Sequence, residues 1–187
     1  MPPKVKISKQ DIIDTALALL REGGEGAVNA RSIAAALGCS TQPIFSNFSS
    51  MEELEESVTL AAYECYLGAL AREAGSGKYP AYKAFGMAYI RFAKEERELF
   101  RHLFMCDRRG KEFKFTSDFD ESVEMIMTAN SVSRELAQLI HLEMWVSVHG
   151  IATILATSFL ELDTNLISDM LTDIYQGIRA RHLTEGN

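Results

Sequence analysis

The first apolar stripe of the chain has the spacing of a helix with one buried face. Its members stand side by side or recur after three or four residues, which matches the period of an amphipathic α-helix: Ile12, Ile13, Ala16, Leu17 and Leu20. Ser8 precedes the stripe and can cap its first turn, and Gly23 and Gly24 follow it. The pattern therefore predicts a first helix between Ser8 and Gly23.

Two short helices are expected next. Asn29 can cap a helix over residues 30–37, which Gly38 would end. Ser40 can cap a third, very short helix, and Pro43 then falls in its first turn, where a missing amide has no helical acceptor to lose. Three helices with a glycine-containing turn between the second and third have the order of a helix-turn-helix motif.

The rest of the chain is also expected to be helical. No stretch alternates apolar and polar residues over several pairs, as a half-buried strand would. Residues 50–53, Ser-Met-Glu-Glu, have the sequence of a capping box ahead of a long helix that ends near Glu73. Further helices are predicted over residues 80–94, 96–105, 118–129, 133–160 and 165–181. The predicted fold class is all-α.

Composition indicates the class of protein and its cellular compartment. The chain has 187 residues, 47% of them apolar, and a formal net charge of -7, which is typical of a soluble globular protein of one or two domains. Three cysteines without a ligand-like spacing favour a reduced, cytoplasmic protein, and no signal peptide is expected. The most apolar run, residues 144–160, is interrupted by polar residues and is shorter than the roughly 20 residues of a membrane span, so we interpret it as a buried helix.

The third short helix has an outer face that can read DNA. Ile44 and Phe48, four residues apart, share its inner face, and the outward residues are Thr41, Gln42, Phe45, Ser46 and Asn47. Gln and Asn can form paired hydrogen bonds with adenine, and Thr can contact a thymine methyl group. A purely structural cluster would be expected to carry apolar residues on this face. DNA binding is therefore the favoured interpretation.

Four segments within residues 8–55 carry a family resemblance: Ala30-Arg31-Ser32-Ile33-Ala34, Leu37-Gly38-Cys39-Ser40, Ile44-Phe45-Ser46-Asn47-Phe48 and Glu52-Glu53-Leu54. They resemble the TetR family of bacterial transcriptional regulators. The later part resembles the WHG-type ligand-binding domain of that family, through Trp145-x3-His149-Gly150, Tyr89-x2-Phe92-Ala93 and Leu99-Phe100-Arg101-x-Leu103-Phe104. Together the two resemblances cover most of the chain.

The resemblance implies a three-helix helix-turn-helix DNA-binding domain over residues 1–50 and a helical effector-binding and dimerisation domain over residues 51–187. The expected function is that of a transcriptional repressor that a small hydrophobic effector releases from a palindromic operator. The residues expected to contact DNA are Lys6, Lys9, Asn29, Arg31, Ser40, Thr41, Gln42, Pro43, Phe45, Ser46 and Asn47.

Two further residue sets are predicted in the second domain. Dense aromatic residues with pliable methionines can leave an apolar effector pocket, whose candidates are Phe85, Tyr89, Phe92, Phe104, Met105, Met125, Trp145 and His149. Most of these aromatic residues can equally be core, and a lone histidine among apolar neighbours is more often a hydrogen-bonded core residue than a ligand. The last two helices are unusually apolar, which indicates a homodimer interface with Val148, Ala152, Leu155, Phe159, Ile167, Met170, Leu171 and Ile174 as candidates.

The chain departs from the family pattern where phosphate contacts are common. Phe45 stands where the family usually has Tyr, Asn47 where it has His or Tyr, and Met51 where it has Lys. Residues 1–50 hold five Lys and Arg residues against four Asp and Glu residues, a net charge of +1, whereas the remainder carries -8. Phosphate binding must then rely on helix amino termini and neutral donors, so we expect DNA affinity to depend only weakly on salt.

Other function classes have less support. The sequence lacks a Ser-His-Asp arrangement, a Gly-rich phosphate loop and Glu-x-x-His spacing, so neither an enzyme nor a cofactor is expected. His102 and Cys106 are four residues apart, but no third and fourth ligand match them, so no metal site is predicted. The alternative is a helical protein-interaction module that retains the helix-turn-helix as scaffold, and changing Gln42 and Asn47 to Ala would discriminate the two.

Overall fold

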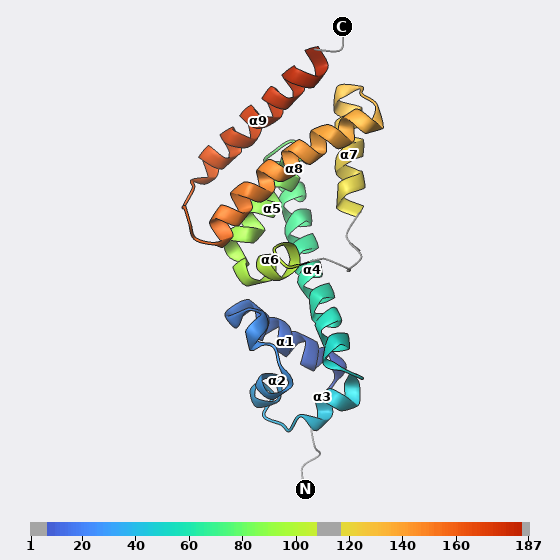
Figure 1. Ribbon diagram of the computed structural model, residues 1–187, viewed down its shortest axis with the longest axis vertical. Coiled ribbons are helices and arrows are strands. Elements are labelled where there is room, and N and C mark those ends of the chain that lie inside the picture. The colour runs from blue at the N-terminus through green and yellow to red at the C-terminus, as the bar shows by residue number, and fades with distance from the viewer. Residues whose placement is uncertain (1–6, 108–116, 185–187) are drawn as a thin grey trace. The chain divides into compact units, whose positions relative to one another are not determined.

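Every regular element in the described part of the chain is helical (Figure 1). The computed structural model describes residues 7–107 and 117–184. Its elements are α1 (Lys9–Gly23), the short 3-10 helix η1 (Glu25–Ala27), α2 (Ala30–Ala36), α3 (Gln42–Asn47), α4 (Met51–Gly75), α5 (Ala81–Glu95), α6 (Arg97–Phe104), α7 (Ser117–Asn130), α8 (Arg134–Ala156) and α9 (Thr164–Thr184). The predicted all-α fold class is confirmed.

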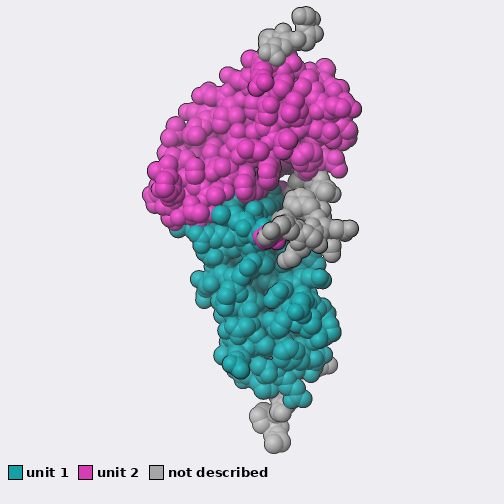
Figure 2. All heavy atoms as spheres, viewed as in Figure 1, with its two compact units in different colours: residues 1–67, 96–106 teal, residues 68–95, 107–187 magenta. Residues whose placement is uncertain are grey.

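The chain divides into two compact units (Figure 2). Unit 1 comprises Met1–Leu67 and Glu96–Cys106, and unit 2 comprises Gly68–Glu95 and Asp107–Asn187. A single helix, α4, contributes residues to both units. The division into functional domains at residues 50 and 51 stays a prediction, since these units are defined by packing and not by activity.

In unit 1, α1 contacts η1, α2, α3 and α6. Its first turn has a full capping box, because the Ser8 side chain accepts from the Asp11 amide while the Asp11 carboxylate accepts from the Ser8 amide. The apolar faces of the surrounding helices close on α1, and the buried side chains include Ile12, Ala16, Leu20, Ile33, Ala34, Ile44, Phe48, Leu54, Val58, Leu99, Phe100 and Leu103. The predicted stripe of the first helix therefore faces a core.

The turn between α2 and α3 follows the helix-turn-helix pattern. Gly38 has a φ of +64°, a left-handed conformation that glycine adopts at little steric cost, and it ends α2. The prediction that Ser40 caps the next helix is wrong, because α3 begins after Thr41, whose side chain makes no capping bond. A cap at Ser40 could bond the amide of the second or third helical residue, and the third would be Pro43, which has none.

The predicted capping box of α4 is only half formed. The Ser50 hydroxyl accepts from the Glu53 amide at 3.3 Å. The Glu53 carboxylate bonds the amide and hydroxyl of Ser49 instead of closing the box on Ser50. Residue 53 is thereby held at the surface beside the start of α1.

In unit 2, α5 and α8 pack on each other and both contact α7 and α9. One part of the core is formed by Val123, Ile126, Ala137 and Ile140. Among the described residues, α8 is long and apolar enough to cross a membrane by length and composition, but 44% of its most apolar window is buried inside the protein. This burial favours a core helix, as we interpreted the apolar run.

Candidate functional site

The outer face of α3 carries exposed side chains held in place by a buried inner face. Ile44 and Phe48 are 1% and 2% exposed, and α3 packs on α1. On the other side Gln42, Phe45 and Ser46 are exposed, and Phe45 has 55% of its surface open. A short helix fixed along one face can present the opposite face to a groove of DNA.

The polar groups of α3 are partly engaged by the helix itself. The Ser46 hydroxyl donates to the Gln42 carbonyl at 2.9 Å, and the Asn47 amide donates to the Pro43 carbonyl at 2.8 Å. Both are bonds from a side chain to the carbonyl four residues earlier. This bond uses one of the two amide hydrogens of Asn47, so the second hydrogen and the Oδ1 oxygen can still pair with a base.

Three predicted DNA contacts lie at the start of α3. Ser40 is exposed, whereas Thr41 and Pro43 are half-buried. The Thr41 carbonyl accepts from the amides of Ile44 and Phe45, at 3.1 and 3.4 Å. Thr41 and Pro43 thus help to form the start of the helix. Their contact with DNA stays a prediction.

Lys9, a predicted phosphate contact, is neutralised within unit 1. Its Nζ lies 2.8 Å from the Glu53 carboxylate and 4.6 Å from the centre of the Phe48 ring. The hydrogen bond from Lys9, and then those from Ser49, lower the pKa of Glu53 to about 2. Lys6, the other basic candidate in this segment, lies outside the described residues.

Asn29 and Arg31 stand at the first turn of α2. The Asn29 side-chain carbonyl accepts from the amides of Arg31 and Ser32, at 3.1 and 3.0 Å. Asn29 is therefore occupied as a helix cap, as its position predicts. The Arg31 side chain is exposed, so Arg31 is the cation of the described DNA-contact set best placed to meet a phosphate.

Sequence reasoning missed Glu53 as a functional residue. The capping-box pattern pointed to it only as a helix signal, because its ionic partner lies 44 residues earlier. Local spacing carries no sign of such a contact. The net charge of +1 for the first fifty residues therefore overstates what this region offers to DNA, since the carboxylate just beyond residue 50 compensates Lys9.

The predicted effector residues belong to both units. Phe104 and Met105 belong to unit 1, and the Phe104 ring packs on Tyr66 and Phe100. The other six lie in unit 2: Phe85, Tyr89, Phe92, Met125, Trp145 and His149.

Within unit 2, His149 links two of the predicted residues. Its Nδ1 shares a hydrogen bond of 2.9 Å with the Tyr89 hydroxyl, and its ring stacks on Trp145 with centroids 5.0 Å apart. Partial burial lowers the pKa of His149. A histidine among apolar neighbours is expected to be hydrogen-bonded, and His149 is.

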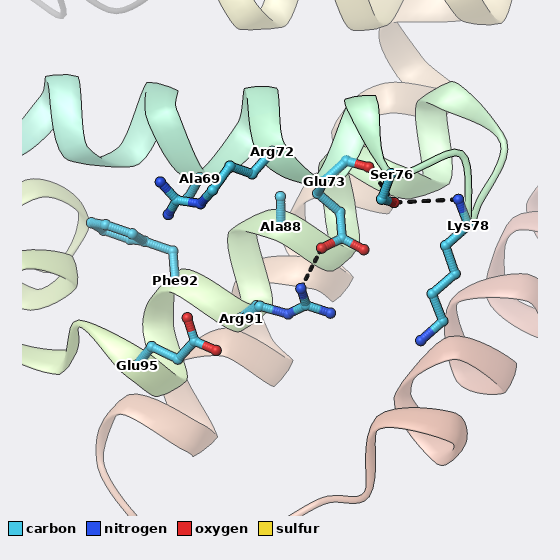
Figure 3. A pocket seen from close by; sticks show the side chains of 9 residues that line it. All are labelled: Ala69, Arg72, Glu73, Ser76, Lys78, Ala88, Arg91, Phe92 and Glu95. Carbon is cyan, nitrogen blue, oxygen red and sulfur yellow. Dashed lines mark hydrogen bonds and ion pairs between the residues drawn. The ribbon is translucent and has the colours of Figure 1, made fainter.

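A cleft of about 240 Å³ lies between the end of α4 and α5 (Figure 3). Of the predicted effector residues, Phe92 lines it. The Glu73 carboxylate is only 4% exposed and pairs with Arg91 at 2.6 Å, so its buried charge is compensated. The lining combines an apolar floor with charged groups and consists of Ala69, Arg72, Glu73, Ser76, Lys78, Ala88, Arg91, Phe92 and Glu95.

Five of the predicted dimer residues are buried inside unit 2 and cannot form an outer surface. Val148, Ala152, Leu155, Ile167 and Leu171 are at most 7% exposed. The reason is internal packing, since α8 and α9 turn these residues toward each other and toward α5. Phe159 is 76% exposed, and Met170 and Ile174 are half-buried.

Comparison with protein families matches residues 12–58 to the bacterial regulatory proteins of the tetR family. Comparison with curated proteins gives no match. Among solved structures, a TetR-like transcriptional regulator from Rhodococcus sp. RHA1 is similar over 100% of both chains, with 17% identity and a TM-score of 0.63.

Two other solved structures are similar. A member of the TetR family from Streptomyces coelicolor A3 is 17% identical, with a TM-score of 0.61, over 88% of this chain and 96% of its own. The multidrug binding protein EbrR, solved in complex with imidazole, is 17% identical with a TM-score of 0.59, over 88% of this chain and 93% of its own. At this identity the likeness shows a shared fold.

Proposed function

Because residues 12–58 match the bacterial regulatory proteins of the tetR family, we propose that the chain is a homodimeric cytoplasmic repressor of transcription, not an enzyme. Each subunit places α3 in the major groove at one half of a palindromic operator. Two-fold symmetry then sets the half-sites about 34 to 36 Å apart, or a multiple of that distance. The observation that carries the proposal is the exposed outer face of α3 above the buried Ile44 and Phe48.

Selection of bound fragments from a random duplex pool by the purified protein at low salt tests this proposal. A palindromic consensus is the expected result, and failure to enrich any sequence would overturn it. Changing Gln42 and Asn47 to Ala removes the two amides on and beside the reading face and should abolish enrichment. Gln176→Ala, an exposed glutamine of α9, is the matched control and should leave enrichment unchanged. Equal enrichment by all variants would mean that residues other than Gln42 and Asn47 read the bases, whereas no enrichment by the parent protein would favour the protein-interaction alternative.

The dimer surface that we propose is the exposed apolar side of α8. Leu139, Leu142, Trp145 and Val146 are between 41% and 58% exposed. Their separations of three and four residues place Leu139, Leu142 and Val146 on one stripe of the helix. A second copy of the same stripe is the partner that two-fold symmetry supplies, and burying it would remove this apolar surface from water.

We further infer that unit 2 binds the effector, a small molecule with an apolar body. The cleft beside Phe92 supports this inference, and Arg72 and Lys78 in its lining would suit an acidic group on the ligand. EbrR, which shares the fold, is described as a multidrug binding protein. An effector that binds better to a state with α4 displaced lowers operator affinity by the same factor, since coupling between two sites is reciprocal.

Release of labelled operator by a library of small organic compounds tests the effector proposal. Arg72→Gln should weaken release by acidic compounds while leaving operator affinity unchanged. Arg181→Gln, an exposed arginine on α9, serves as the matched control. Release by acidic compounds that is insensitive to Arg72→Gln would place their binding site elsewhere than this cleft.

A further inference from the structure

Part of the hydrogen-bonding capacity of α3 is used within the helix. The Ser46 hydroxyl and the Asn47 amide both donate to carbonyls of their own helix. Gln42 and Phe45 are exposed beside them. The Phe45 ring, 55% exposed and without a polar atom, is the large apolar group on this face.

An apolar ring can recognise very little in the major groove. The base edges present hydrogen-bond donors and acceptors, which a phenyl ring cannot pair, and the phosphates are ionic. The exception is the methyl group at C5 of thymine, which projects into the major groove. Cytosine has hydrogen at that position, whereas 5-methylcytosine carries the same methyl group.

If attraction to the phosphates is weak, contacts with the bases, such as that of a ring with a methyl group, must supply a larger share of the affinity for DNA. Lys9 is held by Glu53 at 2.8 Å, and residue 51 is an uncharged methionine. Among the described residues up to position 50, Lys9 and Arg21 are paired with carboxylates, and paired cations contribute little to counterion release. Contacts to base edges then determine both affinity and sequence preference.

We propose that Phe45 reads a pyrimidine C5-methyl group in each half-site of the operator. This inference rests on the proposed function, because it requires α3 to enter the major groove. The methyl group belongs either to thymine or to 5-methylcytosine. Phe45 is then a specificity-determining residue, which discriminates a methylated from an unmethylated pyrimidine edge.

Replacement of thymine by uracil in the selected operator isolates the methyl group. Uracil keeps every hydrogen-bonding group of thymine and lacks only the C5-methyl. One thymine of each half-site should respond, with an affinity loss of about fourfold for one half-site and about fifteenfold for both, as expected for removal of one buried methyl-sized group. All other single replacements should have smaller effects.

Variants at α3 assign the effect to Phe45. Phe45→Ala should bind the thymine and uracil operators equally, because the ring that distinguishes them is gone. Leu60→Ala removes another large exposed apolar side chain of unit 1, on α4 and outside the predicted DNA contacts; it is the matched control and should keep the full preference for thymine. Since Phe45 lies outside the core, both variants should retain the thermal unfolding midpoint of the parent protein, which is measured in parallel.

A second pair of operators distinguishes the two sources of the methyl group. The responsive T·A pair is replaced by C·G or by 5-methylC·G. If the methyl group itself is read, 5-methylC·G should bind about fourfold more tightly than C·G in each half-site. Equal binding of the two would overturn methyl recognition and would indicate readout of the thymine edge.

The outcomes separate this inference from the proposed function. Enrichment of a palindrome whose affinity is insensitive to every uracil replacement overturns the role of Phe45 and leaves the repressor proposal intact. A preference for thymine that persists in Phe45→Ala also overturns it. Failure to bind any selected palindrome overturns both proposals together.

Discussion

Glu53 decides how much positive charge the first helix can offer to DNA. Its carboxylate holds Lys9 and bonds Ser49, which lowers the pKa of Glu53 to about 2 and keeps the carboxylate ionised at any physiological pH. Glu53→Gln should free Lys9 to meet a phosphate. The log-log slope of operator affinity against salt should then steepen by about 0.9 for each added phosphate contact, which fluorescence anisotropy at several salt concentrations measures.

Glu56→Gln is the matched control for this prediction. It removes the same charge from an exposed position of the same helix without releasing a lysine. Its salt slope should stay at the parent value. A slope that changes equally in both variants would mean that overall charge, and not the Lys9 contact, sets the salt dependence.

His141 makes the stability of unit 2 depend on pH. It is 8% exposed, lies 3.0 Å from the Tyr82 hydroxyl and meets the Phe119 ring edge-on, and burial lowers its pKa from 6.5 to about 4. Between these values the unfolded chain binds a proton that the folded chain does not. The free energy of unfolding should therefore fall as pH falls from 6.5 to 4, by at most about 3 kcal/mol.

Chemical unfolding at pH 7, 5.5 and 4.5 measures this effect. In His141→Gln the group no longer titrates, so the part of the pH dependence that His141 causes should disappear. The variant loses some stability at every pH because its packing against Phe119 changes. An unchanged slope between pH 6.5 and 4 would show that other groups cause the acid sensitivity.

At the scale of single elements, the helices were predictable because their signals are local. The caps Ser8 and Asn29 and the glycine at position 38 act on residues within one turn, and each predicted boundary there agrees with the structure within one residue. The predicted cap of α3 was wrong by one residue: Ser40 is a favourable cap, but the helix begins after Thr41, and a cap at Ser40 would lose one of its two possible donors because Pro43 has no amide.

The cap of α2 gives a prediction at this scale. Asn29 accepts from two backbone amides, so Asn29→Ala should lower the free energy of unfolding by about 1 kcal/mol. Asn29→Ser keeps an acceptor at the same place and should lose much less. Equilibrium unfolding in urea compares the two variants. Equal losses would mean that packing around residue 29, and not capping, supports the second helix.

At the scale of the whole molecule, sequence reasoning could not tell inner from outer faces. The last two helices are apolar around much of their circumference, so periodicity alone does not say which side meets α5 and which side stays exposed. The prediction therefore chose residues such as Val148 and Leu155, which are buried within one subunit. The Lys9–Glu53 pair was missed for a related reason, since tertiary packing alone brings these two residues together.

The exposed stripe of α8 leads to the last prediction. Leu142 is 50% exposed in the middle of that stripe, and Leu142→Glu would bury a charge if two copies of the stripe meet. The dimer dissociation constant, measured by analytical ultracentrifugation, should rise at least about tenfold, because an unpaired buried charge costs several kcal/mol.

Thr128→Glu is the matched control for this prediction. It adds the same charge at an exposed position of α7, away from the stripe, and should leave dimerisation intact. Since a palindrome is read by two heads joined in one dimer, operator affinity should fall in Leu142→Glu alone, while binding of a single half-site at high protein concentration stays unchanged. Loss of half-site binding in the same variant would point to misfolding, and an intact dimer would exclude this stripe as the interface.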